Sequence, residues 1–375
     1  MIYWDHNASA PLRPEVAALI EKRLREGAPG NAASVHGAGR RARARLDAAR
    51  AQVAAVLRCE PKEVCFTASG SEADALAVKG AYAAARRKDP RRVRAVISAV
   101  EHPAVLGAAK QLGAEVVEVR PGTDGRVDAG AMLAAVDERT AICSLMWANN
   151  ETGVLQPVAE VAAGCRARGV RFHTDAVQAA GKVPVTVGEA DLLSISGHKL
   201  GAPVGTGALV VRRGVELDAL VPGHQEWGRR GGTQDVLGAE ALALALELAA
   251  GDLQAGAAQV GALRDRFEAL VLSLEQVRIN GAGAPRVPNT SNVLFEGADG
   301  EALLIALDLE GICVSSGAAC ASGSLSPSHV LLAMGLTSAQ AHASLRFSLG
   351  AGATGAEVDQ VAGALHRHLP AARHA

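Results

Sequence analysis

The sequence predicts an α/β protein with a large domain built on a mostly parallel, doubly wound sheet, followed by a smaller α+β domain. Short apolar runs alternate with helical stretches through the first two thirds of the chain, and parallel strands need such crossover connections. Beyond about residue 251 the alternation becomes irregular. The 375 residues are also enough for two domains.

Two helices are predicted before the first strand. Apolar residues recur at helical spacing over Pro14–Arg25, and a second helix, rich in Arg and Ala, covers Arg40–Leu57. The basic face of the second helix is typical of a solvated surface. Seven short apolar runs that follow have the length of buried strands: Glu63–Thr67, Ala95–Ala99, Glu115–Val119, Ala141–Met146, Val170–Thr174, Leu192–Ser196 and Ala208–Val211.

The pattern changes after a long Ala/Leu helix that begins near Gly238. Beyond Gly251, the strand-like runs Asn292–Glu296 and Ile312–Val314 lie between helices. Residues 2–7 have no helix of their own and could pack with either part. We therefore expect a large domain over 14–251, and a smaller one formed by 1–13 and 252–375.

The composition excludes several classes of protein. With 38 Lys and Arg against 39 Asp and Glu, the net charge of −1 makes nucleic-acid binding unexpected. No apolar run is long enough to span a membrane, and no export signal opens the chain, so we expect a cytoplasmic protein. The six cysteines contain no C-x-x-C pair, so neither a metal site nor a disulfide framework is expected.

Polar residues follow several of the predicted strands, at the sheet edge where open α/β sheets bind ligands. Gly70 and Ser71 open a helix after the first strand, as either a phosphate cradle or an ordinary helix cap. His102 follows the second strand. Asn150 lies in an amide-rich turn after the fourth. Each is weak alone, and each has an ordinary structural interpretation.

The next two strands end in a more specific combination. Asp175 ends one strand and Gln178 follows it, while Ser196, His198 and Lys199 end the next strand. Pyridoxal phosphate needs a lysine for its Schiff base, an anion for its ring nitrogen, donors for its phosphate and a ring stacked on its face. The strand ends supply all of these groups in chain order. The sequence therefore predicts a pyridoxal-phosphate site.

Ten segments carry a recognisable pattern in this order: Tyr3–Ser9, Gly30–His36, Phe66–Ala73, Glu101–Val105, Asn149–Gly153, His173–Gln178, Ser196–Lys199, Arg229–Thr233, Val314–Cys320 and Leu345–Gly350. The pattern resembles the NifS/IscS-like cysteine desulfurases, which belong to the fold-type I, class V aminotransferase superfamily of pyridoxal-phosphate transferases. The resemblance covers residues 2 to 350. It departs at Ser71, where the family commonly has Thr, and at Gly231, where Ser is common.

The resemblance implies a role for each matching residue. Lys199 would bond to the cofactor, Asp175 would pair with its ring nitrogen, and His102 would stack on its ring and assist proton transfer. Asn150 and Gln178 would address the ring hydroxyl side. The residues expected around the phosphate are Gly70, Ser71, Ser196, Gly197 and His198, with Thr233 contributed by the partner subunit of a homodimer with a shared active site.

Three further residues would act on the substrate, L-cysteine. Arg346, with Asn31, would bind its carboxylate, since a guanidinium binds a carboxylate in a two-pronged fork. Cys320 lies among small residues, which predicts an exposed loop. The resemblance implies that Cys320 takes the sulfur as a persulfide, leaves L-alanine and serves iron–sulfur cluster or other sulfur-compound biosynthesis.

Three alternatives stay open. A selenocysteine lyase or an aminotransferase would share the same cofactor site. A non-catalytic scaffold for iron–sulfur assembly would keep the fold alone, but the presence of Lys199, Asp175 and Cys320 together argues against it. We expect a sulfur acceptor or iron–sulfur scaffold protein as a partner, and its identity stays open because the short tail lacks the aromatic extension of housekeeping members.

Overall fold

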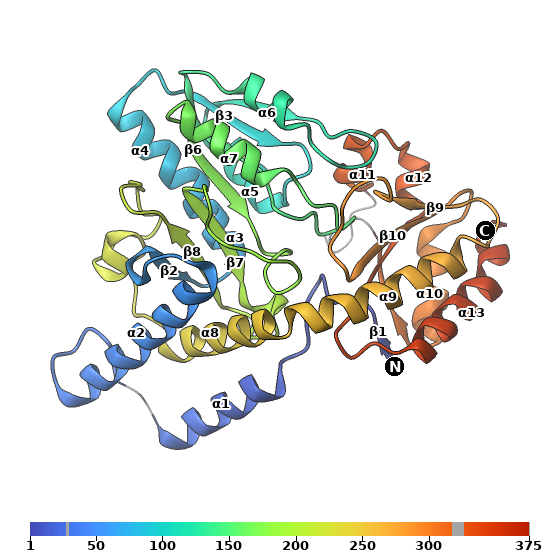
Figure 1. Ribbon diagram of the computed structural model, residues 1–375, viewed down its shortest axis with the longest axis horizontal. Coiled ribbons are helices and arrows are strands. Elements are labelled where there is room, and N and C mark those ends of the chain that lie inside the picture. The colour runs from blue at the N-terminus through green and yellow to red at the C-terminus, as the bar shows by residue number, and fades with distance from the viewer. Residues whose placement is uncertain (28–29, 317–325, 375) are drawn as a thin grey trace.

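The computed structural model describes residues 1–27, 30–316 and 326–374. Within this part of the chain, a seven-stranded sheet forms the larger half of the molecule and a four-stranded sheet the smaller half (Figure 1). The larger sheet has the order β2-β8-β7-β6-β5-β3-β4. Its strands are β2 (Val64–Thr67), β3 (Arg94–Ser98), β4 (Glu115–Val119), β5 (Thr140–Ser144), β6 (Arg171–Asp175), β7 (Leu192–Ser196) and β8 (Gly207–Val211).

Most strands of the larger sheet run in one direction. β8 is antiparallel to both of its neighbours, β7 and β2, whereas the pairs from β7 through β6, β5 and β3 to β4 are parallel. The carboxyl ends of β2, β3, β5, β6 and β7 therefore share one edge of the sheet. The predicted α/β fold with its mostly parallel sheet is confirmed.

Helices cover both faces of this sheet. Leu193 and Val210 pack in one cluster with α2 (Gly37–Leu57) and α8 (Val236–Gly251), against which α1 (Pro14–Glu26) also lies. Leu192 and Leu209 face the opposite side, where they join residues of α3 (Gly70–Ala75). The remaining helices of this half are α4 (Ala81–Lys88), α5 (Pro103–Lys110), α6 (Ala129–Ala135) and α7 (Val158–Ala167), with a π-helical turn over Leu76–Gly80.

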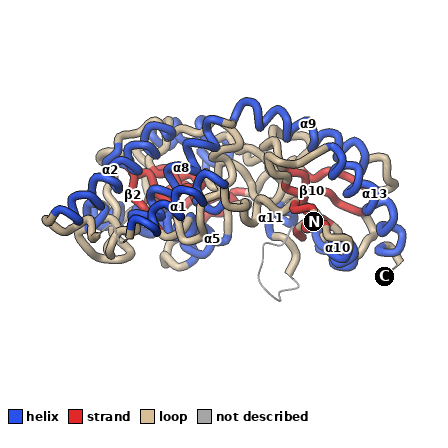
Figure 2. Tube along the Cα trace, turned by 90° about the horizontal axis from the view of Figure 1, so that it is seen from below, coloured by secondary structure: helices blue, strands red, loops and turns tan. Residues whose placement is uncertain are grey.

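The smaller sheet is antiparallel, in the order β12-β13-β10-β9. Its strands are β9 (Val277–Asn280), β10 (Thr290–Phe295), β12 (Ser315–Ser316) and β13 (Ser344–Ser348). The helices α9 (Leu253–Val271), α10 (Gly300–Leu309) and α13 (Gly355–Ala372) lie beside this sheet (Figure 2) and share one apolar cluster with it. Two short helices, α11 (His329–Ala333) and α12 (Ser338–His342), complete this region.

The first residues of the chain belong to the smaller half. β1 (Ile2–Tyr3) pairs with β11 (Ile312–Cys313), and Asp5 bridges to Ser348. Trp4 is 1% exposed and packs edge-on against Phe267, with ring centroids 5.2 Å apart. These contacts anchor residues 5–10 where they cross toward the larger sheet.

The division into domains at residue 252 stays a prediction, and the packing crosses it. Val330 and Leu331 of α11, with Met334 at its end, lie in the same apolar cluster as Val96 and Cys143 of the larger sheet. In the described residues, no helix combines the length and apolar character that a membrane crossing requires.

Candidate active site

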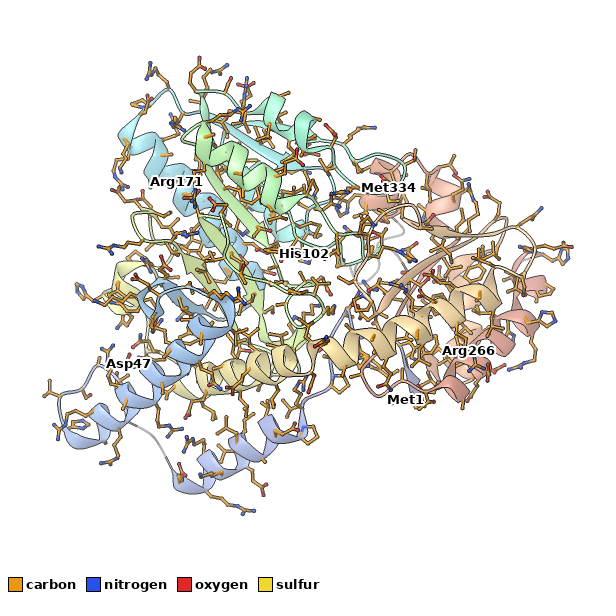
Figure 3. All side chains as sticks on the ribbon, in the orientation of Figure 1. Met1, Asp47, His102, Arg171, Arg266 and Met334 are labelled. Atoms are coloured by element: carbon orange, nitrogen blue, oxygen red, sulfur yellow. The ribbon has the colours of Figure 1, made fainter. Side chains whose placement is uncertain are left out.

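The predicted residues lie at the carboxyl edge of the larger sheet. Gly70 follows β2, His102 follows β3, Asn150 follows β5, and Lys199 follows β7. Figure 3 places His102 near the middle of the molecule, where the two halves meet. The site is therefore framed by strand ends on one side and by the smaller half on the other.

Asp175 is a buried carboxyl at the tip of β6. Its Oδ1 accepts a hydrogen bond from the N–H of Val177 at 2.8 Å. Burial raises the pKa of Asp175 above its ordinary value, and the Val177 N–H and the charge of Lys199 partly offset this effect. Among the described residues, no cation forms a hydrogen bond with this carboxylate. A cationic N–H placed against it would therefore stabilise its charged form.

Lys199 ends a short 3-10 helix, Gly197–Lys199, that follows β7 directly. Its Nζ donates to the backbone carbonyls of Asn7 at 2.7 Å and Ala8 at 2.6 Å. The turn requires glycine at Gly197, because a Cβ there would overlap the hydroxyl of Thr206. The amine is thus held at the strand tip between the sheet edge and the N-terminal segment.

The turn after β2 has the shape of a cradle. Ser69 caps α3 by accepting the N–H of Glu72 at 3.0 Å, so the helix cap is Ser69, and Ser71 stays exposed. A Cβ on Gly70 would lie 2.9 Å from Val177 and 3.0 Å from Ser196. Gly70 and Ser196 therefore meet closely beside the β6 tip, as a shared phosphate site requires.

The two site histidines are neutral. His102 caps α5, and its Nδ1 accepts the N–H of Ala104 at 3.1 Å, which leaves the proton on Nε2. Burial, with the charges of Lys199 and His329, lowers the pKa of His102 to about 4. Burial and Lys199 likewise lower the pKa of His198 to about 4, and its Nδ1 lies 3.4 Å from the hydroxyl of Ser9.

Arg346 enters the site from β13 of the smaller sheet and is 3% exposed. One Nη donates to Asp5 Oδ1 at 2.7 Å, and the other donates to the carbonyl of Asn150 at 3.2 Å. Its Nε is buried, with no hydrogen-bond partner in the described part of the chain. A buried guanidinium with a free N–H is suited to a small carboxylate.

Asn7 connects these residues, and apart from its place in the opening motif no sequence signal singles it out. Its backbone carbonyl accepts from Lys199 and from Gln178 Nε2, the latter at 2.9 Å. Its side-chain N–H groups donate to the carbonyl of Asn150 at 3.1 Å and the hydroxyl of Thr290 at 2.8 Å. Asn7 therefore joins the strand-tip residues to the smaller sheet.

Three predicted residues do not join this cluster within the described chain. Asn31 lies in the exposed loop before α2, and Figure 1 shows the start of α2 at the end of the molecule away from β10, the strand that pairs with β13. Thr233 lies exposed before α8. Cys320 lies outside the described residues. Their roles stay predictions.

Three of the described cysteines have thiols with a raised pKa. Cys65 and Cys143 are buried, and burial raises the pKa of the Cys65 thiol to about 12. The pKa of Cys143 is raised by a hydrogen bond with Cys165 and by burial. Cys59 is partly buried, with a pKa raised to about 12. A thiol with a raised pKa is a poor nucleophile at neutral pH.

The residues present fit pyridoxal phosphate. The buried Asp175 carboxylate suits a protonated ring nitrogen, the Gly70 turn suits a phosphate, and neutral His102 suits the face of an aromatic ring. Lys199 supplies an amine beside them. Chemical complementarity therefore extends to each part of the cofactor.

Comparison with known proteins gives the same result over almost the whole chain. Residues 2–361 match the model of the family described as "Aminotransferase class-V". The IscS-like cysteine desulfurase of Mycobacterium tuberculosis is 41% identical over 100% of this chain and 98% of its own. A cysteine desulfurase of Cereibacter sphaeroides is 44% identical over 96% of this chain and 93% of its own.

Solved structures agree with these relatives. A NifS-like protein matches with a TM-score of 0.90 at 33% identity, covering 98% of this chain and 99% of that one. A NifS-like protein from Rickettsia africae matches with a TM-score of 0.86 at 30% identity over 98% and 99% of the two chains. The chain therefore belongs to the pyridoxal-phosphate-dependent class-V aminotransferase family, and within it to the cysteine desulfurases.

Proposed function

We propose that this cysteine desulfurase converts L-cysteine to L-alanine and receives the sulfur as a persulfide on Cys320. The observation that best supports the proposal is the position of Arg346. Its guanidinium is buried and has one N–H that is unpaired in the described chain. Arg346 and Asn7 donate to the same carbonyl, that of Asn150, and Asn7 in turn accepts a hydrogen bond from Lys199. An amino acid whose carboxylate is held by Arg346 would thus present its α-carbon to Lys199.

Pyridoxal phosphate, when bound, supplies an aldehyde for amines and an aromatic ring that accepts electrons from the substrate's α-carbon. Asp175 would hold the proton of the ring nitrogen, which keeps the ring electron-poor. His102 would cover the ring face as a neutral imidazole. Lys199 Nζ, once released, would take the α-proton of the substrate and return a proton to the product.

The sulfur step requires a thiolate, and Cys320 is the candidate. Attack of its thiolate on the substrate sulfur forms the S–S bond and breaks the carbon–sulfur bond, whose electron pair returns to the substrate carbon. L-cysteine and one enzyme thiol then become L-alanine and one enzyme persulfide, so atoms and electrons balance. Further oxidants are unnecessary.

The proposal extends to a cytoplasmic homodimer that passes sulfur to an acceptor or iron–sulfur scaffold protein. Thr233 and Asn31 are exposed, and the hydrogen-bond partners of Arg346 in the described chain are Asn150 and Asp5 instead. A second copy is the natural recipient of these two side chains. In such a dimer Thr233 would complete the phosphate site of the partner.

The test is incubation of purified protein with L-cysteine, with alanine and protein-bound sulfane sulfur measured together. Cys320→Ala should bind cofactor and change its spectrum with L-cysteine, yet release alanine at least about 100-fold more slowly, because the nucleophile is missing. Wild-type protein should form one persulfide per chain, on the peptide containing Cys320.

Cys313→Ala is the matched control, since Cys313 is partly buried on β11 near the start of the same segment. It should cost about 1 kcal/mol of packing and leave turnover largely intact. Alanine formation at the wild-type rate by Cys320→Ala would refute the persulfide step and favour a lyase that expels sulfur directly. A keto-acid product would favour an aminotransferase.

A further inference from the structure

Lys182 is a partly buried lysine with no assigned role, in the segment that follows β6. Its Nζ donates to the side-chain oxygens of Asn7 at 2.9 Å and of Gln178 at 2.5 Å. In the part of the chain that the structure describes, no carboxylate pairs with it. Burial lowers the pKa of Lys182 well below its usual value, and the charges of Lys199 and Arg346 add to this effect.

The two residues that accept hydrogen bonds from Lys182 both belong to the proposed site. Asn7 contacts Lys199, and Gln178 is the residue predicted to contact the ring hydroxyl of the cofactor. Asn7 gives its side-chain oxygen to Lys182 and its backbone carbonyl to Lys199. Gln178 gives its Oε1 to Lys182 and directs its Nε2 to the same carbonyl of Asn7. Two lysine amines are thus held by one asparagine.

An amide side chain can bind with its oxygen and nitrogen in either of two places, and its neighbours decide which. Because an amino group that donates to both amides lies at Lys182, each oxygen must face it. The amide nitrogen of Gln178 then faces away from Lys182. The amide nitrogen of Asn7 is likewise directed to Thr290 and to Asn150.

We propose that Lys182 is a positioning residue that, together with Asn289 on Asn7 Oδ1, holds the amide orientations of Gln178 and Asn7, and through them the Lys199 amine and the donor offered to the cofactor's ring hydroxyl. This inference rests on the proposed roles of Lys199 and Gln178. It is independent of the sulfur-transfer step, because every measurement below is made without L-cysteine.

Lys182→Met removes the donor and nearly keeps the shape of the side chain. Without it the Oε1 of Gln178 loses its donor, and the carbonyl of Asn7 is left as the contact that orients the amide. We expect the pH midpoint of the bound cofactor's visible absorbance to shift by about half a unit or more, the size expected for loss of one neutral hydrogen bond. The rate at which the apoprotein binds added pyridoxal phosphate should also fall several-fold. Lys110→Met, at an exposed lysine, should change neither.

The charged and titratable groups around this network are shared by all variants, so each comparison isolates Lys182. Lys199, Arg346 and His6 face Lys182. Asp175, His102 and His198 face Lys199. Lys182→Arg keeps a donor, and a cavity of about 560 Å³ that Lys182 lines has room for the larger side chain. Lys182→Arg should therefore restore the midpoint toward the wild-type value.

A second comparison separates positioning from a general loss of structure. Gln178→Leu removes the acceptor, so adding Lys182→Met to it should shift the midpoint by less than half as much as in the wild-type background. The same pair of variants can be used if the Lys182→Met protein does not fold on its own, because Gln178→Leu removes the side-chain oxygen that would otherwise be left without a donor. Equal shifts in both backgrounds, or a Lys182→Met midpoint and cofactor-binding rate equal to those of Lys110→Met, would overturn the proposal.

Discussion

At the scale of single residues, the site rests on buried titratable groups that are held neutral. His173 is fully buried between the hydroxyls of Ser144 and Ser194, at 2.8 and 3.0 Å, and burial lowers its pKa to about 3. The neighbouring carboxyl of Asp74 has a pKa raised well above its ordinary value, by burial and by the charge of Asp175. Because His173 and Asp74 are neutral, Asp175 can be the charged carboxylate that pairs with the ring nitrogen of the cofactor.

Glu101 gives a pH test of this arrangement. Burial raises its pKa to about 8, although Ser98 and the N–H of Met146 both donate to Oε1. The folded chain therefore holds a proton that the unfolded chain releases above about pH 4.5, and stability from this residue falls as the pH rises from about 4.5 to 8. Glu101→Gln removes this loss. Relative to wild type, its melting temperature should rise with pH through this window.

The upper bound of the effect is about 5 kcal/mol, since each pH unit in the window contributes about 1.4 kcal/mol. Thermal unfolding from pH 5 to 9 measures it. Glu118→Gln, at an exposed position of β4, should follow the wild-type curve at every pH. A Glu101→Gln curve that also runs parallel to wild type would show that Glu101 is ionised in the folded protein.

At the scale of elements, the strands of the larger sheet could be predicted because each is a short apolar run ended by glycine or polar residues. Leu192–Ser196 and Glu115–Val119 have the predicted bounds. β13 was not predicted, since Ser344, Arg346 and Ser348 alternate with apolar residues as in an exposed strand. All five of its residues are buried, because Asp5 and Asn150 satisfy Arg346 from distant parts of the chain.

The loop that carries Thr233 is held by one buried ion pair. Arg50 of α2 donates from both Nη atoms to Glu226, at 2.6 and 2.8 Å, and the side chains are 3% and 1% exposed. Arg50 also lies over the rings of Phe66 and Trp227. Glu226 itself has a left-handed backbone, with φ of 49°. The pair therefore fixes a loop conformation that its own backbone disfavours.

Glu226→Ala should cost about 3–5 kcal/mol, because it leaves the Arg50 guanidinium buried without a counter-charge. Chemical denaturation of the cofactor-loaded protein measures the loss. Asp359→Ala breaks an exposed pair with Arg266 and should cost less than about 1 kcal/mol. Equal losses in the two variants would mean that the buried pair adds nothing beyond a surface one.

At the scale of the whole molecule, the site is where a short N-terminal segment crosses between the two halves. The strand-tip residues of the site could be predicted because each follows its own strand in sequence. Asn7 and Asp5 could not be assigned roles in this way, because their partners Asn150 and Arg346 lie far along the chain. Such roles depend on how distant segments meet, which local patterns do not record.

Gly350, just beyond β13, tests whether this crossing holds the site together. A Cβ on Gly350 would overlap the imidazole of His6, the residue before Asn7. Gly350→Ala should push the segment off the smaller half and lower stability by about 1–3 kcal/mol. It should also weaken cofactor binding, since Asn7 holds Lys199 and Gln178.

The double variant His6→Ala with Gly350→Ala distinguishes this explanation from a local defect at Gly350. Removing the imidazole frees the space that the new methyl group needs, so the double variant should regain stability and cofactor affinity over Gly350→Ala alone. His6→Ala by itself leaves a gap and should lower the melting temperature slightly. Fluorescence titration of cofactor and thermal unfolding of the four proteins complete the cycle. Strictly additive losses would mean that residues 348–350 and the N-terminal segment act independently, and that the site does not depend on their contact.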